Sequence, residues 1–269
     1  MANQLADYEV IGAVADDGVL PCSSARRPAR LGGGGGGTVT VWVLGPLARA
    51  PLTSVRRRLE HVAAVRSPHL PDWLEAGAGE WAGRPVVFTS ATTVVTGTLA
   101  GAQGMTMAAK LRALAAAARG AHALHEAGVL HGGICPQAIC LTGPSDGQAV
   151  LAPPPLADGH QPLLQVGYPP LGFVDPHLLR GEAGRWSDIW ALGATLQAAT
   201  SGSPPFPDKD DVPVVQALAQ LLAVPQPVPP EAPPLVAELA RQCLATDPSS
   251  RPRTASEVAD RLDQAAELG

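Results

Sequence analysis

The segment from Asp188 to Ala199 constrains the fold more than any other part of the chain, because it is apolar on nearly every side. Such a helix is stable only when other elements cover it all round, so the segment predicts the centre of a helical layer. Leu111 to Ala127 fits the same layer, since its apolar residues follow a helical period along one face. Near the C-terminus, Thr254 is followed three positions later by Glu257, a capping-box pattern that predicts a final helix.

The first third of the sequence has a different period. Three short runs rich in β-branched and aromatic residues predict strands: Tyr8 to Val14, Thr38 to Leu44 and Pro85 to Thr89. Between the second and third run, Leu52 to Val65 has an apolar stripe at helical spacing with arginines on the opposite side. The front of the chain is therefore expected to be β-rich with one helix.

These patterns together predict an α+β fold with a β-rich small lobe over residues 1–100 and a helical large lobe over residues 101–269. A chain of 269 residues with 46% apolar side chains is long enough for two such lobes. The glycine-rich run at 32–37 and the proline-rich run from Pro225 to Pro234 are interpreted as surface loops.

Composition excludes several classes of function. A formal net charge of −5 argues against a general nucleic-acid binder, which needs clustered Lys and Arg over the domain. Four scattered cysteines without a CxxC pair predict neither a disulfide framework nor a structural zinc site. A metal cluster of His131, Cys135 and Cys140 is an alternative, but the spacing fits no usual zinc pattern.

The sequence shows no secretory signal at its start and no stretch of about twenty apolar residues. The least polar candidate, Val86 to Ala102, is broken by threonines and glycines and is interpreted as a strand and a linker. We therefore expect no membrane span and a cytoplasmic location.

Three motifs point to a family. His122 to Leu141, HALHEAGVLHGGICPQAICL, resembles the helix and catalytic loop of bacterial Ser/Thr protein kinases, whose pattern ends in HRDLKPxNIL. Ser187 to Phe206 resembles the central helix of the large lobe, and Asp247 to Pro252 the late DPxxRP signature. Upstream, Tyr8 to Ala25 and Val39 to Leu44 align with the first three kinase strands. The resemblance covers nearly the whole chain, which is identified as a degenerate member, a pseudokinase.

The resemblance implies structural roles for three residues. In the family, the aspartate at Asp188 bonds the backbone of the catalytic loop, and His131 helps to hold that loop. Arg251 normally pairs with the glutamate of an APE triplet, but the matching triplet here begins at Asp175, which could substitute. The roles of Asp188 and His131 can persist for folding alone.

The positions that hold nucleotide in the family carry other residues here. The glycine-rich GxGxxG loop lets backbone N–H groups approach phosphate, but its glycines align with Ala15, Asp17 and Leu20. The phosphate-binding lysine aligns with Trp42, and its glutamate partner with Arg58, or with Glu60 in a weaker alignment. Trp42 is expected either to stack on Arg58, to fill the nucleotide cleft or to pack in the core of the small lobe.

The catalytic positions are also replaced. The base aspartate, the phosphate-supporting lysine and the metal-binding asparagine align with Gly133, Cys135 and Ala138. The DFG triplet aligns with three prolines from Pro153, which offer neither a carboxylate nor an N–H group. An alternative alignment uses Asp158-Gly159 but needs an insertion and restores one metal ligand.

We therefore predict a non-enzyme that binds no cofactor or metal and acts as a protein-binding scaffold or regulator. The resemblance implies an active Ser/Thr kinase or a forkhead-associated domain protein as partner. Between Pro153 and His177 the only hydroxyl is Tyr168, so phosphorylation is expected elsewhere, at threonines near Thr89 to Thr98 or at Thr200. The alternatives are a residual or atypical ATP-binding kinase and a small-molecule sensor that uses the remodelled cleft.

Overall fold

Short β-rich runs in the first third of the chain form one antiparallel sheet of six strands. The computed structural model describes residues 4–15, 20–32, 36–46, 52–143, 146–155, 170–206 and 232–268. In order across the sheet, the strands are β1 (Gln4–Leu5), β2 (Tyr8–Ala15), β3 (Cys22–Arg26), β4 (Thr38–Pro46), β6 (Arg84–Ala91) and β5 (Trp73–Trp81).

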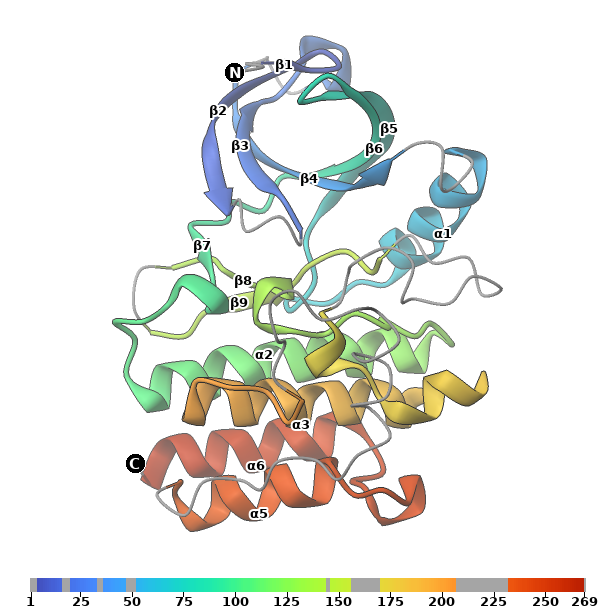
Figure 1. Cartoon of the computed structure of the whole chain (residues 1–269). Helices are drawn as coiled ribbons and strands as arrows, with labels where there is room; N and C mark the ends of the chain where they lie inside the picture. The colour runs from blue at the N-terminus through green and yellow to red at the C-terminus, as the bar shows by residue number, and fades with distance from the viewer. Residues whose placement is uncertain are drawn as a thin grey trace.

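The sheet curls so that its first and last strands approach each other (Figure 1). Gly79 of β5 lies so close to the turn after β1 that an added Cβ would be 3.1 Å from the backbone nitrogen of Ala6. Arg30 ties the same edges together by hydrogen bonds to Asp7 and to Glu75, 2.8 Å from Nη1 to Oε2 of Glu75. Inside the curl lies a small apolar core: Leu5, Tyr8, Ala25, Val39, Val41, Val43, Val86 and Phe88.

Helix α1 (Leu52–Ala64) packs beside β5. Its buried face carries Leu59 and Val62, whereas Arg56 and Arg57 on the opposite side are exposed. This amphipathic pattern is the one that the sequence predicts for the segment.

A second, small sheet connects the first sheet to the helices. It orders β7 (Gly97–Thr98), β8 (Ile139–Leu141) and β9 (Ala149–Leu151), all antiparallel. Six 3-10 turns also occur in the described residues: η1 (Ala29–Leu31), η3 (Leu99–Gly101), η4 (Pro136–Ala138), η6 (Leu171–Phe173), η7 (Pro176–Arg180) and η8 (Pro248–Ser250).

The helices stack below the sheets (Figure 1). They are α2 (Met107–Glu126), α3 (Arg185–Ser201), α5 (Pro234–Cys243) and α6 (Ala255–Leu268). Every residue of α3 from Ser187 to Gln197 is buried, and the helix contacts both α2 and α5. The prediction of a central, covered helix is therefore confirmed, as are the helices predicted around Leu111 and after Thr254.

The ends of these helices show how local chemistry places them. Thr106 begins α2, since its side chain accepts a hydrogen bond from the amide of Ala109. Thr254 accepts from the amide of Glu257 at 3.1 Å in the predicted cap of α6. The Glu257 carboxylate accepts from the amide of Arg253, one residue before the position that a standard capping box uses.

The structure also contains elements that the sequence patterns did not predict, chiefly β1, β5 and α5. Pro234 is the first residue of α5, so the predicted proline-rich loop is wrong at that end, and residues 225–231 lie outside the described residues. Of the glycine-rich run, Gly32, Gly36 and Gly37 lie in the connection between β3 and β4. The boundary between lobes at residues 100 and 101 stays a prediction.

Candidate functional site

The loop before η4 is held by one buried carboxylate. Asp188, on α3, accepts hydrogen bonds from the amides of His131 and Gly132 at 2.9 and 2.8 Å. Its Oδ2 is also 2.7 Å from Nε2 of His125 on α2. Burial alone would raise the pKa of Asp188, but the hydrogen bond and charge of His125 outweigh it, and the pKa lies below its usual value. Asp188 therefore fixes this loop as an anion with three donors.

His131 is a neutral, fully buried part of the same arrangement. The amide of Gly133 donates to its Nδ1 at 3.1 Å, so Nε2 carries the proton and donates to the carbonyl oxygen of Ala152 at 3.0 Å. Burial lowers the pKa of His131 to about 4. We call Asp188, His125 and His131, with the amides that they bind, the Asp188 network.

A second buried ion pair joins the start of η7 to the residue that follows η8. Nη1 of Arg251 lies 2.7 Å from Oδ2 of Asp175, and both side chains are fully buried. The guanidinium also donates to the carbonyl oxygens of Trp186 and Ala245, and its carbon lies 4.9 Å from the ring centroid of Trp190. The sequence left the partner of Arg251 open, and in the structure Asp175 pairs with it.

Trp42 lies on β4 of the large sheet and is fully buried. On β4 it pairs in register with Cys22 of β3, and its ring centroid is 5.8 Å from that of Trp73. It also interacts with the thiol of Cys140 on β8. Because β8 belongs to the small sheet, Trp42 bridges the space between the two sheets.

Two thiols, those of Cys22 and Cys140, lie beside Trp42 between the large and the small sheet. Burial raises the pKa of Cys22, and the neighbouring Cys140 raises it further. Burial raises the pKa of Cys140 to about 12, although its interaction with Trp42 favours the thiolate. Both cysteines are therefore protonated, neutral packing groups at pH 7. We call Cys22, Trp42, Trp73 and Cys140 the apolar plug.

Arg58, on α1, points toward the loop before η4. Its Nη2 donates to the carbonyl oxygen of Leu130 at 3.4 Å, and its positive charge contributes to the lowered pKa of His131. The aromatic ring that packs against Trp42 is that of Trp73. Glu60, the alternative position for the family's glutamate, is exposed.

Comparison with known families decides how to interpret this geometry. Residues 62–262 match the model of the protein tyrosine and serine/threonine kinase family, about three quarters of the chain. The chain belongs to this family. No curated protein matches the chain. The family assignment and the mixture of helices and strands agree with the predicted α+β, kinase-like fold.

The matched range begins inside α1, so the kinase alignments of Ala15, Leu20, Trp42 and Arg58 depend on motif spacing. In the structure, Ala15 ends β2 and pairs with Cys22, and Leu20 is buried. Asp17 lies outside the described residues.

Within the matched range, the positions aligned with kinase catalytic residues face the interior. Gly133, Cys135 and Ala138 are all buried, and the amide of Ala152 donates to the carbonyl oxygen of Ala138 at 2.8 Å. Pro153 follows directly and is also buried. Residues 156–169, and with them the alternative Asp158-Gly159 alignment and Tyr168, lie outside the described residues.

The predicted phosphorylation sites differ in exposure. Thr89 and Thr98 are buried, whereas Thr92 and Thr96 are exposed. Thr200 is partly buried, and its hydroxyl donates to the carbonyl oxygen of Leu196 inside α3. Thr92 and Thr96 are thus the most accessible hydroxyls of this set.

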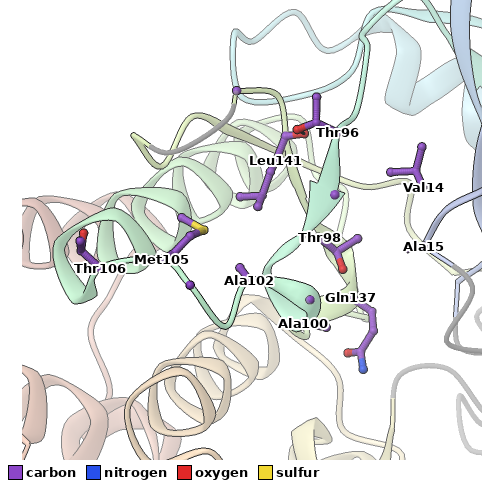
Figure 2. A pocket seen from close by; sticks show the side chains of 14 residues that line it. Val14, Ala15, Thr96, Thr98, Ala100, Ala102, Met105, Thr106, Gln137 and Leu141 are labelled. Carbon is purple, nitrogen blue, oxygen red and sulfur yellow. Dashed lines mark hydrogen bonds between the residues drawn. The ribbon is translucent and has the colours of Figure 1, made fainter.

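A pocket of about 940 Å³ opens next to the apolar plug. Its walls come from β2, from the chain between β7 and the start of α2, and from η4 and β8, as Figure 2 shows. Sequence patterns did not predict this pocket, because its lining combines segments more than a hundred residues apart. Nor did they predict His125 or Cys140 as partners of Asp188 and Trp42, which only the packing of α2 and β8 reveals.

Two negative findings apply to the described part of the chain. No group of three or more His, Cys, Asp or Glu side chains there is placed to hold a metal ion, and this includes His131, Cys135 and Cys140. Within the same residues, no helix combines the length and apolar character that crossing a membrane requires.

Proposed function

We propose that this kinase-family chain is a catalytically inactive pseudokinase that binds other proteins, in the cytoplasm and within bacterial Ser/Thr kinase signalling. One observation carries the proposal: the position aligned with the phosphate-binding lysine holds Trp42, which is fully buried and packed against Trp73. Phosphoryl transfer depends on charged groups that hold the triphosphate and its metal ions. An indole in an apolar environment supplies no such charge.

The other aligned positions support the same interpretation. Gly133 and Ala138 stand where the family's base and metal ligand would lie, and their side chains offer no proton acceptor or metal ligand. The apolar plug also places indole rings and neutral thiols between the sheets, where a triphosphate would need charged or polar partners. The Asp188 network and the Arg251–Asp175 pair, by contrast, maintain the fold and so a surface for partners.

Thermal unfolding with magnesium–ATP tests the inactive state. A ligand at 100 times its Kd stabilises a folded protein by about 2.7 kcal/mol, which corresponds to a rise in Tm of roughly 5 to 10 °C for a chain of this size. We expect no rise here, with an active Ser/Thr kinase domain as positive control in the same assay. A rise that requires magnesium would contradict the proposal and would favour an atypical kinase.

The partner proposal rests on the two exposed threonines. An active Ser/Thr kinase is expected to phosphorylate Thr92 or Thr96, and a forkhead-associated domain is expected to bind the product through the added phosphate. Mass spectrometry locates the phosphate, and a pull-down with the purified domain measures binding.

The matched control for this test is Thr200→Val, since Thr200 is partly buried in α3, whereas Thr92 and Thr96 are exposed. The double variant Thr92→Val/Thr96→Val should lose both phosphorylation and capture, while Thr200→Val should retain them. Unchanged capture by the double variant would exclude these two residues as the signal.

A further inference from the structure

The described lining of the pocket beside the apolar plug carries no charged side chain. None of the described residues that line it is Asp, Glu, Lys, Arg or His. Its apolar walls include Val14, Met105 and Leu141, and several glycines and alanines widen it (Figure 2). A carboxylate, phosphate or ammonium group entering it would lose hydration without gaining a charged partner, and this disfavours ionic ligands.

Gln137 contributes a side-chain amide to the lining of the pocket. It lies on η4, directly before Ala138, and its Oε1 is buried without a hydrogen-bond partner among the described residues. Leaving a buried carbonyl oxygen unpaired is unfavourable. Rotation about the last side-chain torsion of glutamine is soft and exchanges the two ends of the amide, so that Oε1 can turn to a donor in the pocket.

The threonines of the pocket differ in what they already bind. Thr96 donates to the carbonyl oxygen of Leu141, and Thr106 accepts from the amide of Ala109 at the start of α2. The hydroxyl of Thr98 makes no hydrogen bond to any described residue. Gln137 and Thr98 are therefore the side chains best able to bind a polar group of a ligand.

We propose that this pocket binds an uncharged small molecule that carries an amide or an equivalent adjacent donor and acceptor. The ligand's N–H donates to Oε1 of Gln137, and its carbonyl oxygen accepts from the Gln137 amide or from the Thr98 hydroxyl. The apolar part of the ligand packs against Met105 and Leu141. The proposal does not depend on the proposed inactivity: the lining includes Ala15, which aligns with the glycine-rich loop, but none of the positions aligned with the lysine, the base, the asparagine or the DFG triplet.

Benzamide and benzoate provide a matched pair of probes, since they share size and shape but differ in charge and in the N–H donor. Ligand-observed NMR titration of the full chain should show benzamide binding with a Kd on the order of 1 mM, as a small ligand in an open pocket allows. Benzoate should bind about tenfold more weakly. Equal binding of the two, or no binding of benzamide, would overturn the proposal.

Variants then locate the binding. Gln137→Met keeps the volume but removes the amide, and it should weaken benzamide binding about fivefold to tenfold. Gln103→Met is the control, because Gln103 is exposed in the same segment and does not line the pocket. Ala100→Phe, which fills the mouth of the pocket, should abolish binding. Benzamide binding that survives in both Gln137→Met and Ala100→Phe would place it elsewhere on the molecule and refute the inference.

Discussion

The Asp188 network and the apolar plug are close in the fold but opposite in chemistry. Asp188 is a buried anion that satisfies two backbone amides and one imidazole. Trp42 is a buried indole whose Nε1 has no hydrogen-bond partner among the described residues, surrounded by a second indole and two neutral thiols. The network fixes the backbone of the loop before η4, whereas under the proposed function the plug occupies the position that aligns with the charged lysine of active kinases.

Under the proposed function, this contrast explains how a kinase fold can persist without kinase chemistry. Removing a buried carboxylate that binds backbone amides leaves several donors unpaired, so the fold depends on it. A tryptophan in place of a lysine removes a charge and adds apolar contact area, both of which favour burial at this position. The following substitutions test whether the two regions differ in this way.

The largest effect is expected when the aligned lysine is restored. Trp42→Lys should destabilise the fold by roughly 5 kcal/mol, because it leaves a cavity and buries an unpaired ammonium group among apolar residues. Chemical denaturation measures the loss, and Trp42→Phe, which keeps an apolar ring, should cost clearly less. If Trp42→Lys were as stable as the wild type and bound magnesium–ATP, the position would still be a working nucleotide site.

Breaking the Arg251–Asp175 pair comes next. Arg251→Met should cost about 4 kcal/mol, since it leaves the carboxylate of Asp175 buried without its partner. The double variant Arg251→Met/Asp175→Leu should recover much of the loss, because no buried charge is then left unpaired. A double variant that is as unstable as the sum of the single variants would show that packing, not charge, dominates at this site.

The Asp188 network should also make stability depend on pH. Since the pKa of His131 is about 4 in the fold and about 6.5 when unfolded, the unfolded chain binds more protons between these values, and stability falls as pH decreases. From pH 7 to pH 5, this one group lowers the free energy of unfolding by about 2 kcal/mol.

The control for that pH effect is His131→Asn, which removes the titrating group. The charged or titrating neighbours of His131 are Asp188, Arg58 and His125, and all remain in the variant. The difference in stability between pH 7 and pH 5 should shrink by about 2 kcal/mol relative to the wild type. An unchanged pH dependence would mean that His131 is not the source.

The sequence predicts strongly periodic elements well. Helices α2, α3 and α6 were predicted because each has a long apolar face or a clear cap. Strand β5 was missed because Trp73–Trp81 contains no β-branched residue, and it is extended through its pairing with β6 rather than through its own propensity. Helix α5 follows a proline-rich run, and Pro234 fits the first turn of a helix as well as it fits a loop.

For the site, alignment gave the identity of each replaced residue but not its surroundings. Cys22, Trp73 and Cys140 come from three distant segments, and their contact with Trp42 depends on strand register and on how β8 meets the large sheet. Neither the strand register nor the packing of β8 against the large sheet can be derived from the local sequence. The sequence could predict that Trp42 is buried, since an indole favours an apolar environment, but it could not predict which residues surround it.

The smallest effect separates two buried cysteines. Cys140→Ser replaces a thiol, which Trp42 approaches without a hydrogen bond of normal geometry, by a hydroxyl, so a new hydrogen bond from the indole N–H can offset the burial of the hydroxyl. Cys243→Ser, in α5, is the matched control because that thiol is equally buried but lies outside the plug. We expect Cys140→Ser to cost about 1 kcal/mol less than Cys243→Ser in denaturant titrations. Equal costs would show that the indole N–H does not face Cys140, and the plug would then be held by apolar packing alone.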